Sequence, residues 1–485
     1  MTRISLLKPS AAAGIGTSLN AMSTAPEKDR GSCQCSATLA LTLACLVFAS
    51  SVSAAVSISA TPEAALLDQR LTIQIFGLKP NAPVRVSAKS QAQDALWWRS
   101  DAVFIANDQG QIDLDRQAPQ SGSYVSADVM GLFWSMRPDK EPKRADHLSF
   151  AIEDFSKPVM TKIDVTDTSG ATVSASIERR YARMGVRSVA VHDNVVATLY
   201  EYDHQAALPG VLVIGGSDGG PGAPGVAMLL ASHGFAAVSL SYFGVAGLPP
   251  TLQNVPLEYF QKALQWMRTQ PDIDPRSIAI YSESRGTEAA LFTAANNSGV
   301  SAVVARSPSF AFWSGMTATH LPGKAAWTFQ GQPLPYIANT LYPDFILTYL
   351  WDRTAGIPVR QTPLFLEDLA HSTSPDKTAI PVEQIHGPVM LLAGADDQIW
   401  PSTMMAERIM ARLRLRGHAY RDQSVTFADV GHPIPYVYLP TRGNWRDSPF
   451  AVGGTPEGMA KAQANAWPQI LKFLSDEADR ARSNQ

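Results

Sequence analysis

Cysteine is scarce in this chain, and its few copies stand near the N-terminus. The three residues are Cys33, Cys35 and Cys45. If the leader described below is removed, the remaining chain has no cysteine, which excludes a disulfide framework, a cysteine zinc site and a cysteine nucleophile. Cys45 does not indicate a lipid anchor, because Thr42 stands where a lipoprotein signal usually has leucine.

The sequence also lacks an excess of positive charge, and it has no long apolar run beyond the one near the N-terminus. The 485 residues include 40 Lys and Arg against 43 Asp and Glu, a net charge of -3. Nucleic-acid binding normally needs clustered Lys and Arg, so the expected partner is a small molecule. Beyond the leader no segment reaches the roughly 18 apolar residues that span a bilayer. The oligomeric state is left open.

Residues 1–54 have the pattern of a secretory signal peptide, because basic residues precede an apolar run over 37–48 and small residues follow it. Cleavage near Ala54 would give an exported, periplasmic protein. Without cleavage the protein would be anchored in the membrane or cytoplasmic. A true start at Met22 would give a leader of more ordinary length.

From residue 56 to residue 187 the pattern is that of short β-strands. Leu71, Ile73 and Ile75 alternate with polar residues, and Asn107–Gly110 indicates a hairpin turn. Short strands separated by polar turns are typical of an antiparallel β-sandwich. No catalytic constellation occurs in this region.

In residues 188–485, unbroken apolar runs alternate with helical segments. Such runs are typical of strands buried on both faces, and their alternation with helices predicts a doubly wound, mainly parallel sheet. The expected strands are Val211–Ile214, Ala236–Leu240, Ser277–Tyr281, Ala302–Ala305, Val389–Ala393 and Ser424–Phe427.

Residues 310–380 interrupt this alternation and are rich in aromatic residues, among them Trp313, Trp327 and Trp351. Such a stretch is not a plain disordered linker. It could be a lid or insertion over an apolar substrate site, or it could supply core packing, since aromatic side chains are mostly buried for packing alone.

Ser282–Gly286, with the sequence SESRG, has the pattern of a nucleophile elbow. It follows a predicted strand and precedes a segment that favours helix. In a doubly wound hydrolase the nucleophile stands on such a turn, with small residues two before and two after it because the backbone is crowded. Ser284 is the predicted nucleophile, and Ser282 is the small residue in the place of a more usual glycine.

A serine hydroxyl needs a base, and the base needs an acid that orients it. In this fold class they follow in the order Ser, Asp or Glu, His, each after a strand. His432 is the predicted base and Asp397 the predicted acid, with Asp396 shaping the turn. Either carboxylate could reach a histidine on the next loop.

Negative charge on the attacked oxygen needs backbone N–H donors. The expected donors are the amide of Arg285 and that of Gly216 or Ser217, in the glycine-rich loop after Ile214. This loop lacks the order of a phosphate-binding loop, which argues against a nucleotide. Asp218 in it is expected to form the turn.

Short segments in both regions carry a family resemblance. They are Ala60–Pro62, Gly122–Tyr124, Met130–Met136, Arg179–Tyr181, Gly185–Arg187, Val255–Phe260, Ser284–Glu288, Ile380–Glu383 and Gly394–Asp397. With them the chain resembles the acyl-CoA thioester hydrolase and bile acid-CoA:amino acid N-acyltransferase family. Met130–Met136 is the most specific segment, because ordinary esterases do not carry it.

The resemblance implies an immunoglobulin-like sandwich before an α/β-hydrolase domain, and a triad of Ser284, Asp397 and His432. It also implies acyl-CoA substrates and a place in fatty acid metabolism. Members that transfer the acyl group to an amino acid carry cysteine at the nucleophile position. Serine at this position therefore implies hydrolysis, with water as the acceptor.

We expect a serine hydrolase that cleaves acyl thioesters, most simply acyl-CoA to free acid and CoA, without a metal or redox cofactor. One alternative is an exported carboxylesterase or dienelactone-hydrolase-like enzyme with the same triad, because an exported enzyme would rarely meet cytosolic CoA thioesters. The other is a catalytically silent exported binding protein. Arg179 and Arg180, near the joint of the two regions, are expected to pair with acidic neighbours.

Overall fold

The computed structural model describes residues 55–140, 149–202, 207–317, 321–373, 375–442 and 449–483. The predicted leader, with the three cysteines, lies outside these ranges. Residues Ser53–Gln485 form one compact unit. No helix in the described ranges has both the length and the apolar character that a bilayer crossing requires.

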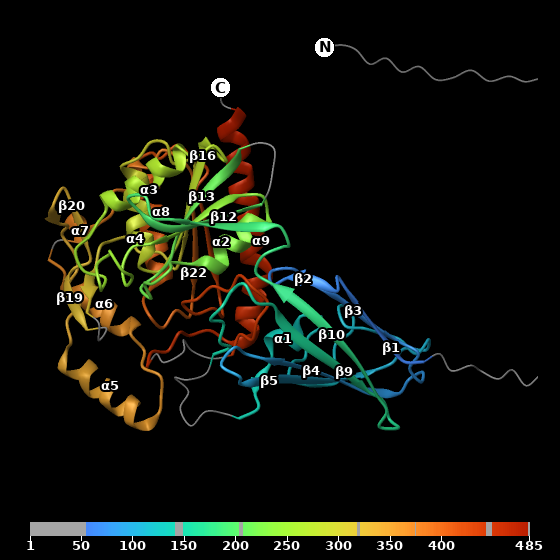
Figure 1. The fold of residues 1–485 in the computed structure, drawn as a ribbon. Helices are drawn as coiled ribbons and strands as arrows, with labels where there is room; N and C mark the ends of the chain where they lie inside the picture. The colour runs from blue at the N-terminus through green and yellow to red at the C-terminus, as the bar shows by residue number, and fades with distance from the viewer. Residues whose placement is uncertain are drawn as a thin grey trace, which may run out of the picture. The chain divides into compact units, whose positions relative to one another are not determined.

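The first region is built from short strands that form two sheets (Figure 1). The strands are β1 (Ser57–Thr61), β2 (Ala64–Leu66), β3 (Thr72–Phe76), β4 (Pro83–Gln91), β5 (Trp97–Ile105), β6 (Ile112–Asp113), β7 (Ser121–Gly122), β8 (Arg137–Pro138), β9 (Val159–Thr166) and β10 (Thr172–Arg180). The smaller sheet has the order β1-β3-β6 and the larger one the order β2-β10-β9-β4-β5-β7, with β8 also pairing with β5. The pair β2 and β10 is parallel, whereas β4 pairs antiparallel with both β5 and β9.

Side chains from both sheets meet in one apolar core. In β4 every second residue is buried, including Val84 and Val86, as expected of a strand with one solvent face. Ile73 and Ile75 of the smaller sheet lie in the same cluster. The single-turn helix α1 (Gly131–Trp134), within the most specific of the family-like segments, is fully buried in this core.

The predicted hairpin at Asn107–Gly110 is wrong, although the turn itself is present. The side chain of Asn107 accepts hydrogen bonds from the amides of Gln109 and Gln111, and Gly110 has a φ of +69°. However, β6 pairs with β3 in the smaller sheet and not with β5, the strand before the turn. Turn chemistry specifies that the chain reverses, whereas the pairing partner depends on which sheet buries Ile112.

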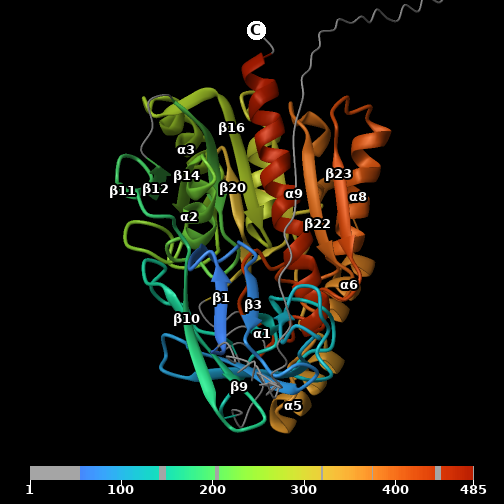
Figure 2. The same ribbon diagram turned by 90° about the vertical axis from the view of Figure 1, so that its right-hand side faces the viewer.

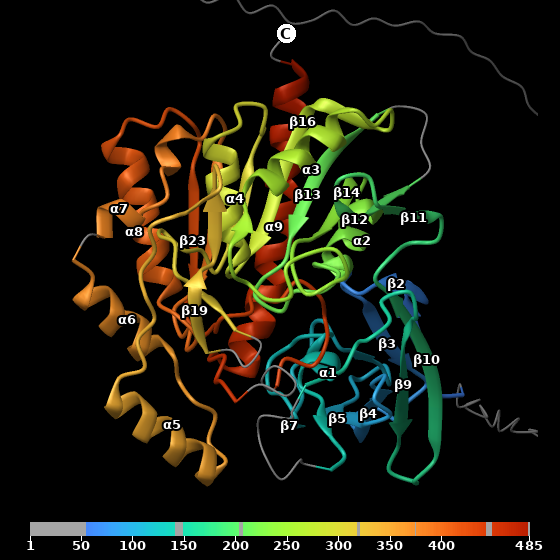
Figure 3. The ribbon, with the colours of Figure 1, turned by 60° about the vertical axis from the view of Figure 1, so that its left-hand side comes forward.

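The second region contains a large, mainly parallel sheet with helices on both faces (Figures 2 and 3). Its strands are β11 (Val186–Val191), β12 (Val196–Tyr202), β13 (Leu208–Ile214), β14 (Ala236–Ser241), β16 (Ile273–Glu283), β17 (Val303–Arg306), β22 (Val389–Gly394) and β23 (Gln423–Phe427). Their order is β11-β12-β14-β13-β16-β17-β22-β23, antiparallel up to β14 and parallel from β14 onwards. This is the sheet of an α/β hydrolase, as predicted.

The helices of this region divide between the two faces of the sheet. They are α2 (Pro224–Ser232), α3 (Glu258–Arg268), α4 (Gly286–Ala295), α8 (Ser402–Leu415) and α9 (Pro456–Ser483). In β13, Val211 and Val213 share a core cluster with residues of α2 and α9, and Leu212 and Ile214 share another with residues of α3, α4 and α8. Every position of the strand is apolar because both faces are covered.

Polar contacts join the two regions. The predicted boundary at residue 188 falls inside β11, so the large sheet begins slightly earlier. A carboxylate oxygen of Asp68 accepts the indole N–H of Trp467 on α9 and also lies 2.6 Å from Nε2 of His233. These bonds fasten the loop after β2 to both α9 and the end of α2.

The two arginines near the joint behave differently. Arg180 pairs with Glu178, as expected. The same expectation is wrong for Arg179, which is 1% exposed, donates to the carbonyl oxygen of Tyr438 and stacks 4.2 Å from the ring of Phe133. Burial lowers the pKa of Arg179 to about 9. Its side chain links β10 to a loop of the second region.

The aromatic segment has two parts with different surroundings. It contains β18 (Ser314–Met316), β19 (Pro322–Ala325), β20 (Trp327–Phe329), β21 (Gln332–Pro333), α5 (Pro343–Ala355), α6 (Thr362–His371) and α7 (Pro375–Thr378), and the turn η2 (Val382–Gln384) follows it; β20 pairs with β15 (Val255–Pro256). Trp313 and Trp327 are buried in the core, so core packing describes the first part. Helix α5 has no buried residue, and its Trp351 is 72% exposed. The lid interpretation stays a prediction for this helix.

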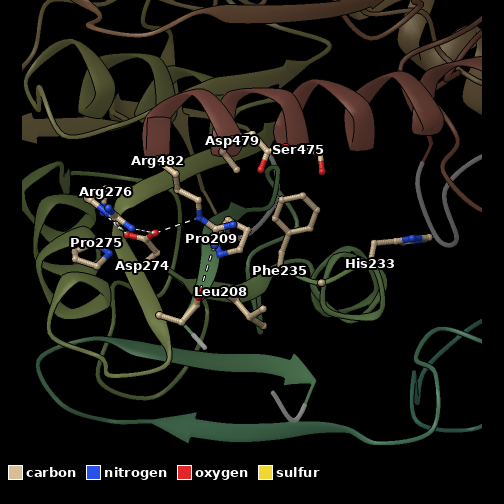
Figure 4. Close-up of a pocket in the computed structure, with 13 residues that line it drawn as sticks. Leu208, Pro209, His233, Phe235, Asp274, Pro275, Arg276, Ser475, Asp479 and Arg482 are labelled. Atoms are coloured by element: carbon tan, nitrogen blue, oxygen red, sulfur yellow. Dashed lines mark hydrogen bonds and ion pairs between the residues drawn. The ribbon is translucent and has the colours of Figure 1, made fainter. Parts of the chain in front are cut away.

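A pocket of about 810 Å³ lies at the amino-terminal edge of the large sheet, away from the strand ends that carry the predicted catalytic residues. Figure 4 shows Asp274, at the start of β16, between the guanidinium groups of Arg276 and Arg482. Arg482, in the last turn of α9, also donates to the carbonyl oxygen of Ala207. The carboxylate therefore ties the end of α9 to the first residues of β16.

The Asp274 carboxylate should make stability depend on acid pH. Its hydrogen bonds to Arg276 and Arg482 lower its pKa from 3.8 to about 2. A carboxylate whose pKa is lowered in the folded protein stabilises the fold at pH values above its ordinary pKa. This stabilisation is lost as the pH falls through about 2. We expect Asp274→Asn to lower the thermal midpoint at pH 7, with a smaller difference from wild type at pH 2.5. Asp476→Asn, on an exposed ion pair, is the control, and a difference that does not vary with pH would contradict the assignment.

Candidate active site

Ser284 stands on a strained turn between β16 and α4. Its φ is +51°, a left-handed value that residues other than glycine rarely adopt. Its N–H donates to the carbonyl oxygen of Arg306 at 2.9 Å, and its own carbonyl accepts the amide and the hydroxyl of Thr287. Position 286 has to be glycine, because a Cβ would lie 2.2 Å from the carbonyl oxygen of Gly215.

The other serine of the elbow has a different environment. Ser282 is fully buried, and its hydroxyl donates to the carbonyl oxygen of Val304 on the neighbouring strand at 3.0 Å. A small side chain fits there, and its polar atom is satisfied by the sheet. Of the two serines, Ser284 is the one whose hydroxyl lies within hydrogen-bonding distance of His432.

Ser284, His432 and Asp397 form a hydrogen-bonded chain. The Oγ of Ser284 lies 2.8 Å from Nε2 of His432, and Nδ1 of the same ring lies 2.9 Å from an oxygen of Asp397. Asp397 also accepts the amides of Ile399 and Trp400, which fix its orientation. Each residue follows a different strand, so the chain is assembled by the sheet.

Asp396, the other candidate acid, faces away from the histidine. Its carboxylate accepts the amide of Gly454 at 2.8 Å and the side-chain amide of Gln398. The structure thus places Asp397 at the imidazole and Asp396 in the turn that supports it.

His432 and Asp397 are 3% and 7% exposed, which keeps their interaction largely away from water. The ring of Trp400 packs edge-on against the His432 imidazole, with centroids 5.5 Å apart, and Phe365 of α6 packs edge-on against Trp400. The amide of His432 donates to the carbonyl oxygen of Val452. The imidazole is therefore held by packing as well as by hydrogen bonds.

The glycine-rich loop after β13 lies against Ser284. A Cβ on Gly216 would lie 3.2 Å from the Cβ of Ser284, so glycine permits this approach. The hydroxyl of Tyr242 donates to the carbonyl oxygens of Gly215 and Gly216 and fixes the loop. Within the described part of the chain, the amides of Gly216, Ser217 and Arg285 donate to no other backbone group. They are the amides that the sequence analysis singled out as oxyanion donors.

A buried ion pair beside Ser284 was not predicted from the sequence. Arg285 pairs with Glu288 one turn along α4, and these residues are 4% and 0% exposed. Glu288 also accepts hydrogen bonds from the indole N–H of Trp327 and from the backbone amide of Trp313, both of which are buried. Arg285 donates to the carbonyl oxygens of Trp313 and Ser314. Burial raises the pKa of Glu288, and the guanidinium of Arg285 opposes this shift. The pair fastens the elbow helix to the aromatic segment.

The cavity at Ser284 is small, at about 60 Å³, and lined mostly by polar side chains. Besides the predicted residues it is lined by Glu283, Arg306, Ser307 and Pro433. Among the residues that the structure describes, no group of three or more His, Cys, Asp or Glu side chains could hold a metal ion. Glu283 and Pro433 carried a sequence signal, their places next to Ser284 and His432.

Comparisons with known proteins match both regions of the chain. Residues 255–479 match the family model "BAAT / Acyl-CoA thioester hydrolase C terminal", and residues 68–193 match "Acyl-CoA thioester hydrolase/BAAT N-terminal region". Acyl-coenzyme A thioesterase 6 of Homo sapiens is 29% identical over 430 residues, which cover 84% of this chain and 93% of the relative. Acyl-coenzyme A amino acid N-acyltransferase 1 of Mus musculus is 27% identical over 434 residues, or 86% and 97% of the two chains.

The chain belongs to the acyl-CoA thioester hydrolase and bile acid-CoA:amino acid N-acyltransferase family.

The resemblance predicted from short segments is thereby confirmed, and this family member is a thioesterase-like hydrolase. Among solved structures, a puromycin-hydrolyzing peptidase of Mycobacterium tuberculosis has a TM-score of 0.41 at 12% sequence identity, over 80% of this chain and 53% of that one.

Removal of Glu288 should destabilise this family member strongly. Glu288→Ala leaves the Arg285 guanidinium buried without its carboxylate and the Trp327 indole without its acceptor. Breaking a buried pair on one side typically costs about 3–5 kcal/mol, measurable as a lower free energy of unfolding in urea. The control is Glu407→Ala on the exposed face of α8, with an expected change within about 0.5 kcal/mol. Equal effects of the two substitutions would show that the pair is not a stabilising contact.

Proposed function

We propose that this enzyme hydrolyses acyl thioesters, most simply acyl-CoA to free acid and CoA, with Ser284 as nucleophile, His432 as base and Asp397 as the acid that orients the base. The observation that carries the proposal is the hydrogen-bonded chain from the Ser284 hydroxyl through both ring nitrogens of His432 to Asp397. Family membership supports the thioester as substrate, since a relative is an acyl-coenzyme A thioesterase.

In the proposed reaction, Oγ of Ser284 attacks the acyl carbonyl carbon while Nε2 of His432 takes the hydroxyl proton. The carbonyl oxygen becomes an oxyanion, held by the amide of Arg285 and by that of Gly216 or Ser217. The carbon–sulfur bond then breaks, and the thiolate leaves with a proton from the imidazolium. Water, deprotonated by His432, then attacks the acyl carbon of the acyl-enzyme. The bond from this carbon to Oγ of Ser284 breaks, Oγ takes the proton from His432, and the free acid is released.

The sequence pattern of the leader favours a second candidate, an exported hydrolase of carboxylic esters with the same residues in the same roles. Export would separate the enzyme from cytosolic CoA thioesters. A carbonyl ester passes through the same tetrahedral oxyanion, so the site chemistry does not distinguish the two substrates. Activity measured on both kinds of substrate distinguishes the two candidate functions.

We also propose that the first region is an immunoglobulin-like sandwich. Support comes from its two sheets, whose inward side chains share one core, and from its antiparallel ladders. The parallel pair β2 and β10 lies at the edge of the larger sheet, where the chain approaches the second region.

Substitution of Ser284 tests the proposed reaction. We expect Ser284→Ala to lower kcat on a panel of short to long acyl-CoA thioesters by at least about 10³-fold, because no nucleophile remains. Matched p-nitrophenyl esters show whether thioesters or esters are preferred. Ser282→Ala, which alters a buried serine two residues away, is the control and should keep most of the activity. A fluorophosphonate probe that fails to label Ser284 would support a silent binding protein instead.

The two adjacent aspartates can be separated in the same way. Asp397→Asn removes the carboxylate at Nδ1 of His432, favours the wrong tautomer, and is expected to lower kcat by roughly 10³- to 10⁴-fold with little change in KM. Asp396→Asn alters only the supporting turn, so its main expected effect is a lower thermal midpoint. A larger loss of kcat in the Asp396 variant would reverse the assignment.

A further inference from the structure

Arg306 and Ser307 lie where the loops of the site converge. Arg306 is the last residue of β17, the strand between the nucleophile's strand and the strand that leads to Asp397. Its carbonyl oxygen accepts the N–H of Ser284 at 2.9 Å, and the N–H of Ser307 donates to the carbonyl oxygen of Leu392 at 2.8 Å. This short stretch therefore touches the backbones of two strands that carry the site.

The side chains of the same two residues hold the loop of the base. A guanidinium nitrogen of Arg306 donates to the carbonyl oxygen of Ile434, and the hydroxyl of Ser307 donates to the carbonyl oxygen of His432 at 2.5 Å. Ser307 has a φ of +45°, a strained value that brings its hydroxyl under the loop. The backbone of the base is thus bound on both sides of Pro433.

The other guanidinium nitrogen of Arg306 faces the nucleophile's strand. It donates to a carboxylate oxygen of Glu283 at 2.9 Å and to the hydroxyl of Tyr281. The group also lies over the rings of Tyr281 and Tyr436, 5.8 and 5.4 Å from their centroids. One buried cation therefore bonds both to the residue before Ser284 and to a carbonyl two residues after His432.

We propose that Arg306, assisted by Ser307, is a positioning residue that sets the distance between His432 and Ser284. The inference rests on the proposed function, because it assigns a purpose to that distance. Arg306 is 4% exposed, its two terminal nitrogens are engaged by protein acceptors, and its Nε is buried without a hydrogen-bond partner among the residues that the structure describes. Arg306 lines the cavity beside Ser284, but the hydrogen bonds of its terminal nitrogens all go to protein groups, so we assign it a role through the base and the nucleophile.

The arrangement of hydrogen-bond acceptors around Arg306 requires a guanidinium group and not simply a positive charge. Two different terminal nitrogens of one rigid plane bond to Glu283 and Ile434, whereas the single ammonium of lysine is a point charge on a flexible stem. Misplacing a reacting group by about 1 Å can cost about 10² in rate. A lysine at this position should therefore fail to restore the rate although it keeps the charge.

The test uses Arg306→Met, Arg306→Lys and Ser307→Ala, assayed well below their thermal midpoints. We expect both arginine variants to lower kcat by about 10²-fold with KM changed less than about threefold, and Ser307→Ala by about tenfold. The control is Arg412→Met, which breaks another arginine–glutamate pair, with Glu383, away from the site. It should lower the thermal midpoint while kcat stays within about twofold of wild type.

Chemical rescue separates positioning from general destabilisation. Guanidinium ion at a concentration too low to unfold the protein should raise kcat in Arg306→Ala but not in Arg412→Ala. If Arg306 variants do not fold, Ser307→Ala alone still has to show the loss. Arg306→Met with kcat within threefold of wild type would overturn the inference and leave the proposed function intact. Activity that survives in Ser284→Ala would instead overturn the proposed function.

Discussion

The site depends on the parallel direction of four neighbouring strands, β16, β17, β22 and β23. Parallel strands present their carboxyl ends at one edge of the sheet, so whatever follows each strand meets there. This constraint brings Ser284 and His432 to the same edge of the sheet, although 148 residues separate them. It also explains why β17 contributes to the site without carrying a predicted catalytic residue, because its end lies between the strands that do.

Most of the large sheet could be predicted because strands buried on both faces are apolar at every position. The same chain order made Ser284 and His432 predictable, since each follows such a strand. Asp397 was predicted as the acid and Asp396 as the turn residue, but the contact that holds Asp396 in the turn could not be predicted, because its partner, the amide of Gly454, is distant in sequence. Arg306 gave no signal for a similar reason: in the sequence it is one polar residue after an apolar run, and its partners lie on other loops.

In the first region the local sequence pattern predicted the strands, whereas the pairing of one strand depends on residues that are distant in sequence. Alternation of polar and apolar residues predicted strands correctly, and Asn107 formed its turn as expected. The predicted pairing of β6 with the strand before the turn was nevertheless wrong, because alternation indicates only that one face of a strand is buried. Which sheet buries it follows from the whole core, including α1, whose apolar residues have no strand period.

Ser284 stands between two buried or half-buried ion pairs, and this arrangement accounts for its strained backbone. Glu283, before it, pairs with Arg306, and Arg285, after it, pairs with Glu288. A left-handed φ at a serine costs on the order of 1–3 kcal/mol and persists only where the surroundings over-determine it. Neither flanking side chain can relax without leaving a charge unpaired. The first pair fastens the turn to the loop of the base and the second to the aromatic segment, so strain at one residue is held by contacts to two separate parts of the fold.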